Sequence, residues 1–132
     1  MRILAIGDPH GDIRKIERIT LSKSDLILIT GDVGKADFAR NRFFENIKRK
    51  KRGLKELKYT AKDNKKAYKE IFNSSLEILR YTSKFAPTYS ILGNVGMHMI
   101  YDSNVRKDEK RYGTKLPSLR QSMDRIKNFY FV

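Results

Sequence analysis

Hydrophobic residues occur in continuous runs at four places along the chain, and each run predicts a buried β-strand. The predicted strands span residues 2–6, 25–30, 88–92 and 129–132. Three of these runs end in a glycine followed by aspartate or asparagine: Gly7-Asp8, Gly31-Asp32 and Gly93-Asn94. Almost wholly apolar strands are typical of a parallel sheet, so the chain is predicted to have an α/β fold.

Amphipathic segments between the runs predict helices. Ile13, Ile16 and Ile19 lie on one face of a first helix, for which Asp12 is the predicted N-cap. Residues 35–84 predict a long helical region interrupted near Gly53. Its expected inward-facing residues are Phe43, Ile47, Leu54 and Leu57 before and after the break, then Ala67, Ile71, Phe72, Ser75 and Leu79. Residues 95–113 are expected to form a loop, and 118–127 a last helix.

Composition narrows the class of protein. The chain has 132 residues, 39% apolar and 33% charged, which suits one domain with a small core. It contains no cysteine, which excludes disulfides and thiolate metal sites and fits a reducing, cytoplasmic setting. No apolar run is long enough to span a bilayer, so we expect no membrane association.

Positive charge is concentrated in the middle of the chain. The formal net charge is +14, and residues 35–84 hold 16 basic against 6 acidic side chains. Such a segment attracts phosphates, nucleic acid or acidic partners. A solvated helical face has the same composition, so both interpretations stay open.

The polar residues that follow the strands form a candidate metal site. The carboxyl ends of parallel strands meet at one edge of a sheet, where ligands bind. Asp8 and His10 can reach the same ion, Asp32 enters from the next strand, and Asn94 adds an amide oxygen. Mixed nitrogen and oxygen ligands suit Mn²⁺, Fe²⁺ or Zn²⁺, and two such ions can support phosphoester hydrolysis. Each motif alone is also common as a helix cap or turn, but their joint order favours a site.

These motifs resemble the calcineurin-like metallophosphoesterase superfamily from the first strand to about residue 96. The matching residues are Gly7-Asp8-Pro9-His10-Gly11-Asp12, Gly31-Asp32 and Gly93-Asn94. The resemblance implies two divalent metals, with Asp8 and His10 on the first, Asp32 bridging both, and Asn94 on the second. It also implies a β-sheet flanked by helices, half of a four-layer α/β/β/α sandwich, and hydrolysis of phosphomonoesters, phosphodiesters or nucleic acid.

Two features depart from the family pattern. Val95-Gly96 stands where the family has a histidine followed by an acid. His98 lies nearby, but we do not assign it the catalytic role. The chain has only two histidines, so the later histidine ligands of the family are missing.

We therefore expect residues 1–132 to be a single, apparently truncated metallophosphoesterase domain with a basic helical insertion at 35–84. Alone it should have weak or no activity, and an uncovered apolar sheet should favour self-association.

Two further hypotheses stay open. The chain could be a non-catalytic scaffold that keeps the phosphoesterase fold, as the missing histidines suggest. It could also bind nucleic acid through the basic segment, as a main or accessory property.

Overall fold

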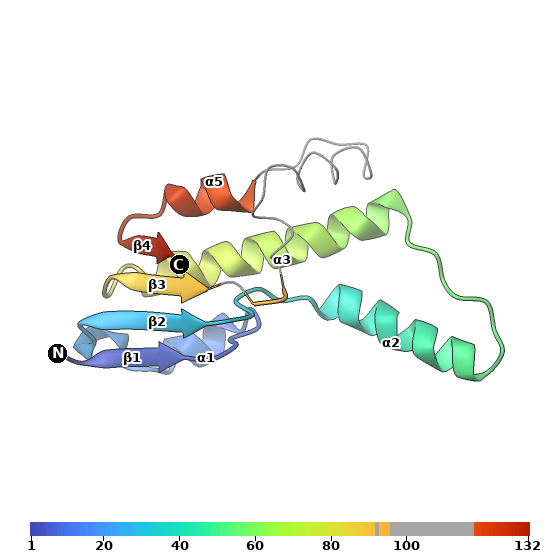
Figure 1. The fold of residues 1–132 in the computed structure, drawn as a ribbon, viewed down its shortest axis with the longest axis horizontal. Coiled ribbons are helices and arrows are strands. Elements are labelled where there is room, and N and C mark those ends of the chain that lie inside the picture. The colour runs from blue at the N-terminus through green and yellow to red at the C-terminus, as the bar shows by residue number, and fades with distance from the viewer. Residues whose placement is uncertain (92, 96–117) are drawn as a thin grey trace.

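A four-stranded parallel sheet organises the chain, for which the computed structural model describes residues 1–91, 93–95 and 118–132. The strands follow one another in the order β1-β2-β3-β4, as Figure 1 shows. Their bounds are Ile3–Ile6 for β1, Leu26–Thr30 for β2, Thr88–Ile91 for β3 and Phe129–Phe131 for β4. All four lie within one or two residues of the predicted runs, and the predicted α/β class is confirmed.

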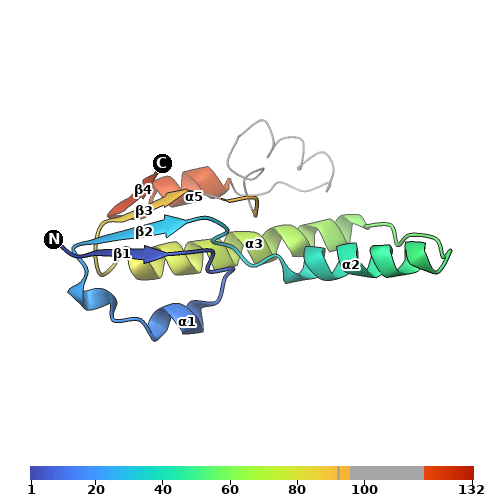
Figure 2. The same cartoon turned by 60° about the horizontal axis from the view of Figure 1, so that its bottom comes forward.

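Helices connect the strands, and some of them cover one face of the sheet. They are α1 (Ile13–Glu17), a 3₁₀ turn (Leu21–Lys23), α2 (Asp37–Lys51), α3 (Ala61–Thr82) and α5 (Leu119–Asp124). In Figure 1 the strands lie in front of α3, and Figure 2 shows α1 and α3 on the same side of the sheet. Among the described residues, no helix is long and apolar enough to cross a membrane.

The hydrophobic core lies between the sheet and α3. Ile27 and Ile29 of β2 are buried with Ile78 and Leu79 of α3, and Met123 of α5 closes the cluster. Alternate residues of each strand enter this core, because successive side chains of a strand point to opposite faces. The face of the sheet that points toward α3 is therefore covered by the core.

The opposite face of the sheet exposes apolar side chains. Ile3 is 51% exposed, Ile91 47% and Tyr130 47%, although all three belong to strands. Tyr89 and Tyr130, paired in register on β3 and β4, stack with ring centroids 4.7 Å apart. This is the uncovered apolar sheet that the sequence led us to expect, while self-association through it stays a prediction.

Three local expectations were wrong. α1 ends at Glu17, so Ile19 is not part of the first helix. Leu54 and Leu57 are not helical, because α2 ends at Lys51 and the chain turns through Gly53 at a φ of +68°. Phe43 and Ile47 do lie on α2 but are exposed, since no residue of this helix is buried. The prediction that Asp12 is the N-cap residue of α1 is confirmed, but its side chain makes no capping bond, and its carboxylate lies 3.6 Å from the Lys15 ammonium.

The helical region breaks at Gly53, as expected, and the two helices on either side of the break form a projecting arm. We define the arm as residues 37–69, which comprise α2, the connecting segment 52–60 and the first part of α3. Figures 1 and 2 show it extending beyond the carboxyl ends of the strands. The arm therefore starts at the edge of the sheet where the candidate site lies.

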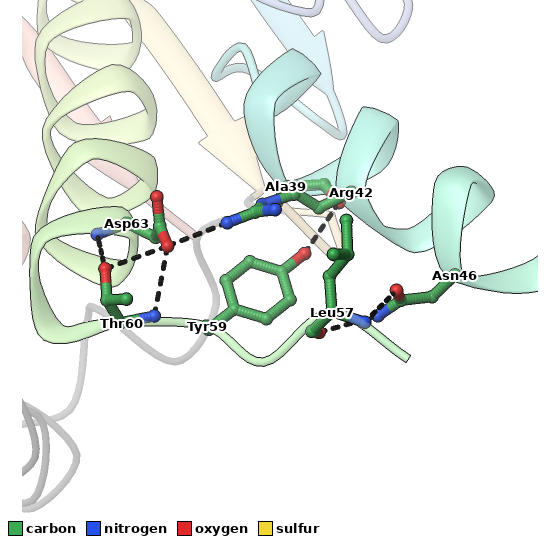
Figure 3. A network of polar contacts seen from close by, with 7 residues as sticks. All are labelled: Ala39, Arg42, Asn46, Leu57, Tyr59, Thr60 and Asp63. Atoms are coloured by element: carbon green, nitrogen blue, oxygen red, sulfur yellow. Dashed lines mark hydrogen bonds and ion pairs between the residues drawn. The ribbon is translucent and has the colours of Figure 1, made fainter. Parts of the chain in front are cut away.

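Polar contacts hold the two sides of the arm together (Figure 3). Arg42 of α2 donates to the Asp63 carboxylate of α3 over 2.8 Å. The Tyr59 hydroxyl donates to the Ala39 carbonyl, and the Asn46 amide exchanges two hydrogen bonds with the Leu57 backbone. The side of α2 that faces the connecting segment is thus fixed by hydrogen bonds rather than by an apolar core.

Asp63 makes part of the arm's stability depend on pH. Hydrogen bonds from the Thr60 backbone and hydroxyl, and then Arg42, hold the pKa of Asp63 below its usual range. A lowered folded-state pKa means that this stabilisation is complete above the unfolded pKa of about 3.9 and is lost as pH falls through the folded value. We expect Asp63→Asn to lower the urea midpoint at neutral pH, with a smaller difference near pH 3 (about one unit below that unfolded value). An equal difference at both pH values would contradict this role.

Candidate metal centre

The candidate ligands lie where β1, β2 and β3 end at one edge of the sheet. β1 ends at Ile6 before Gly7-Asp8, and β2 ends at Thr30 before Gly31-Asp32. β3 ends at Ile91, two residues before Gly93-Asn94. Because β2 pairs with both β1 and β3, the three glycine motifs lie side by side.

Each aspartate lies against the glycine of the next motif. A Cβ on Gly31 would lie 2.5 Å from Asp8 Oδ1, and a Cβ on Gly93 would overlap Asp32 Oδ1. Such separations are shorter than real Cβ contacts, so any side chain at these positions would displace the carboxylates. The glycines therefore make room for the two acidic groups, a role distinct from the turns they also allow.

Hydrogen bonds tie the loops of the site to one another. The backbone N–H groups of His10 and Gly11 donate to the carbonyls of Asp32 and Val33 at 2.9 and 2.8 Å. Asp32 Oδ1 accepts the Val95 N–H at 2.9 Å, which links the β2 end to the β3 end. These bonds position the Asp32 backbone and one of its carboxylate oxygens.

The first loop has an unusual backbone. Asp8 and His10 have φ values of +37° and +47°, which are uncommon for residues other than glycine. Residues held in such conformations cluster at functional sites, where the surrounding contacts must fix them. Here the hydrogen bonds to the Asp32 and Val33 carbonyls supply that constraint.

A cavity of about 790 Å³ opens beside this loop. Asp8 and His10 line it, together with Asp12, Arg14 and Lys35. Lys35 was not singled out from the sequence. It reaches the cavity because its N–H donates to Ser74 Oγ of α3 at 2.7 Å and its Cβ lies close over Gly11. Its ammonium lies 3.3 Å from the Asp37 carboxylate, so the two side chains form an ion pair at the rim of the cavity.

The predicted ligands are brought to one edge but do not form a closed ligand cluster. Within the described part of the chain, no three His, Asp or Glu side chains are arranged to hold a metal ion. Asp32 and the exposed Asn94 also lie outside the lining of the cavity. The donor types still fit a divalent ion, because two carboxylates, an imidazole and an amide oxygen suit hard or borderline metals. His98 falls outside the described residues, so its role stays untested.

The parallel sheet and its strand-end acids define an α/β protein with an oxygen-rich site at the carboxyl edge. The sequence matches the family of calcineurin-like phosphoesterases over residues 1–129, and the chain belongs to this family. No curated protein and no solved structure gave a match in the corresponding comparisons. The resemblance drawn from Gly7–Asp12, Gly31-Asp32 and Gly93-Asn94 is thereby confirmed at the level of the family.

Proposed function

We propose that the chain supplies the first ligands of a divalent-metal-dependent phosphoesterase that hydrolyses phosphomonoesters or phosphodiesters. The observation that carries the proposal is the placement of the Asp8 and Asp32 carboxylates against Gly31 and Gly93. Family membership supports hydrolysis of phosphoesters in general. Mn²⁺ as the preferred ion and a cytoplasmic setting remain predictions from composition and ligand type.

The residues at the carboxyl edge of the sheet would have different roles in binding two ions. Asp8 and His10 would hold one ion, Asn94 a second, and Asp32 both. When bound, such ions act as Lewis acids on phosphoryl oxygens and lower the pKa of water. Lys35 and Arg14 line the same cavity and would attract the phosphate by charge. The Val95 N–H restrains one oxygen of Asp32 and so orients the other.

Asp32→Asn tests this site most directly. We expect at least about a 100-fold loss of Mn²⁺ affinity, because even changes to residues that only orient the ligands of a metal cost about 10- to 100-fold. Titration calorimetry with Mn²⁺ measures the binding, and hydrolysis of an aryl phosphodiester measures the activity. Asp124→Asn, on an exposed position of α5 away from the edge, is the matched control. Equal Mn²⁺ binding by the two variants would refute the proposed ligands.

A non-catalytic scaffold is the second candidate. It is favoured by the open arrangement of His, Asp and Glu side chains among the described residues, and by Val95-Gly96 at the family's histidine position. On this hypothesis the intact chain binds Mn²⁺ weakly or not at all. Tight binding at two sites in the same titration would decide against it.

A further inference from the structure

The outer face of α2 combines aromatic and basic side chains that are exposed in the described chain. Phe43 and Phe44 are 60% and 52% exposed, and their rings contact edge to face with centroids 5.7 Å apart. Arg40, Ile47 and Lys51 share this face, since residues three, four, seven and eleven positions apart align on a helix. Nothing in the fold itself requires two exposed phenylalanines here.

The arm also carries most of the chain's excess charge. Residues 37–69 contain 13 Lys and Arg against 4 Asp and Glu, a net +9 of the total +14. Among the described residues, Arg42 is the one arm cation that forms an ion pair, with Asp63. The cluster Lys48-Arg49-Lys50-Lys51-Arg52 ends α2 with no carboxylate partner in that part of the chain. Its charge is therefore available to an external anion.

Cations and aromatic rings are mixed on one surface of α2, and this mixture favours a nucleic acid over a membrane as the ligand. A helix that lies on a membrane keeps its cations on a polar face, opposite its apolar face. On α2, Arg40 and Lys51 share the surface of Phe43 and Phe44 instead. A single-stranded nucleic acid presents phosphates and flat bases together, and proteins bind it with cations and aromatic platforms.

The length of the arm also favours a polymer. The 15 residues of α2 span about 22 Å at about 1.5 Å per residue. The helix begins at Asp37, which lines the same cavity as Asp8 and His10, and ends at the basic cluster. A small phosphoester could not contact both ends of α2, whereas a strand with a phosphate at each nucleotide could.

We propose that the outer face of α2 binds single-stranded nucleic acid and leads one of its phosphodiesters to the strand-end site. The second part of this proposal rests on the proposed phosphoesterase function, whereas the first part does not. The hydrogen bonds of Arg42, Tyr59 and Asn46 fix the opposite side of α2 and so hold the outer face in place (Figure 3).

Fluorescence anisotropy with labelled oligothymidylate in EDTA measures binding without cleavage. We expect Lys50→Gln/Lys51→Gln/Arg52→Gln to bind at least about tenfold more weakly and to reduce the slope of log K against log salt by about 2, at about 0.7 per phosphate contact. Lys23→Gln/Lys84→Gln/Lys127→Gln removes the same charge at the opposite edge of the sheet and should retain the slope. Equal effects of the two triple variants would overturn the proposal.

Phe43→Ala/Phe44→Ala tests the aromatic contribution separately from charge. Loss of base stacking should weaken binding at least about fivefold, since stacking is worth about 1–3 kcal/mol per base. Because both rings are exposed, circular dichroism should show an unchanged fold. Unchanged oligothymidylate affinity, with loss of cosedimentation on phosphatidylserine vesicles, would assign the arm to membranes and overturn the proposal.

The same variants separate this proposal from the phosphoesterase function. Oligothymidylate binding that persists in Asp32→Asn, with no Mn²⁺ binding by the intact chain, would support nucleic-acid binding by the arm and refute the proposed metal site. Hydrolysis of a small aryl phosphodiester without oligothymidylate binding would support the hydrolase and refute the arm.

Discussion

A single methyl group at position 93 is expected to weaken Mn²⁺ binding about 10- to 100-fold. Substitutions of residues that hold a metal ligand in place reduce metal affinity by this factor. In Gly93→Ala, the new Cβ would overlap Asp32 Oδ1 and lie 2.5 Å from the Asp32 nitrogen. The Asp32 carboxylate must move, and the strand ends must separate. Overpacking of this kind also costs about 1–3 kcal/mol of stability. Titration calorimetry and urea unfolding measure the two effects.

Gly7→Ala is the matched control for this prediction. Gly7 belongs to the same kind of motif, but a Cβ there would meet Thr30 Oγ1 at an ordinary 3.8 Å. Neither Gly7 nor Gly93 has a positive φ, so backbone strain does not separate the two variants. If both substitutions reduce Mn²⁺ affinity equally, the contact between Asp32 and Gly93 is not what organises the site.

Leu79→Ala is expected to lower the free energy of unfolding by about 2–5 kcal/mol. Leu79 is completely buried where α3 packs on the sheet, so its truncation removes contacts and leaves a cavity. A domain with a total stability of about 5–15 kcal/mol would lose a large part of it. Urea unfolding followed by circular dichroism measures the loss, since the chain has no tryptophan.

Leu54→Ala makes the same chemical change where the side chain is 50% exposed at the end of the arm. We expect a change within about 0.5 kcal/mol there, as for most surface substitutions. A large loss in Leu54→Ala would mean that the arm contributes to the core, contrary to its exposed position. A small loss in Leu79→Ala would place the core elsewhere.

The strands and glycine motifs could be predicted from the sequence because their signal is local. An apolar run followed by glycine and an acid contains both the strand and its end. The contact of Asp8 with Gly31, and of Asp32 with Gly93, could not be predicted in this way. It depends on the sheet order β1-β2-β3, which no single run encodes.

The arm shows the limit of helical periodicity. Phe43 and Ile47 have the spacing of a buried face, yet both are exposed on α2. Periodicity identifies a shared face but not what covers it, so an outward aromatic face gives the same pattern as a core. Lys35 was missed for another reason, because it reaches the cavity only through the approach of two loops and α3.

The placement of acids against glycines also bears on how the sheet finds its register during folding. Parallel strands have no tight hairpin to set their alignment, and a shift by one residue would turn every side chain to the opposite face. Asp8 fits beside β2 only where Gly31 leaves space, and after a shift it would meet Thr30 or the like-charged Asp32. The contact of Asp8 with Gly31 would then do two things: it would position a proposed metal ligand and fix the correct pairing of β1 with β2.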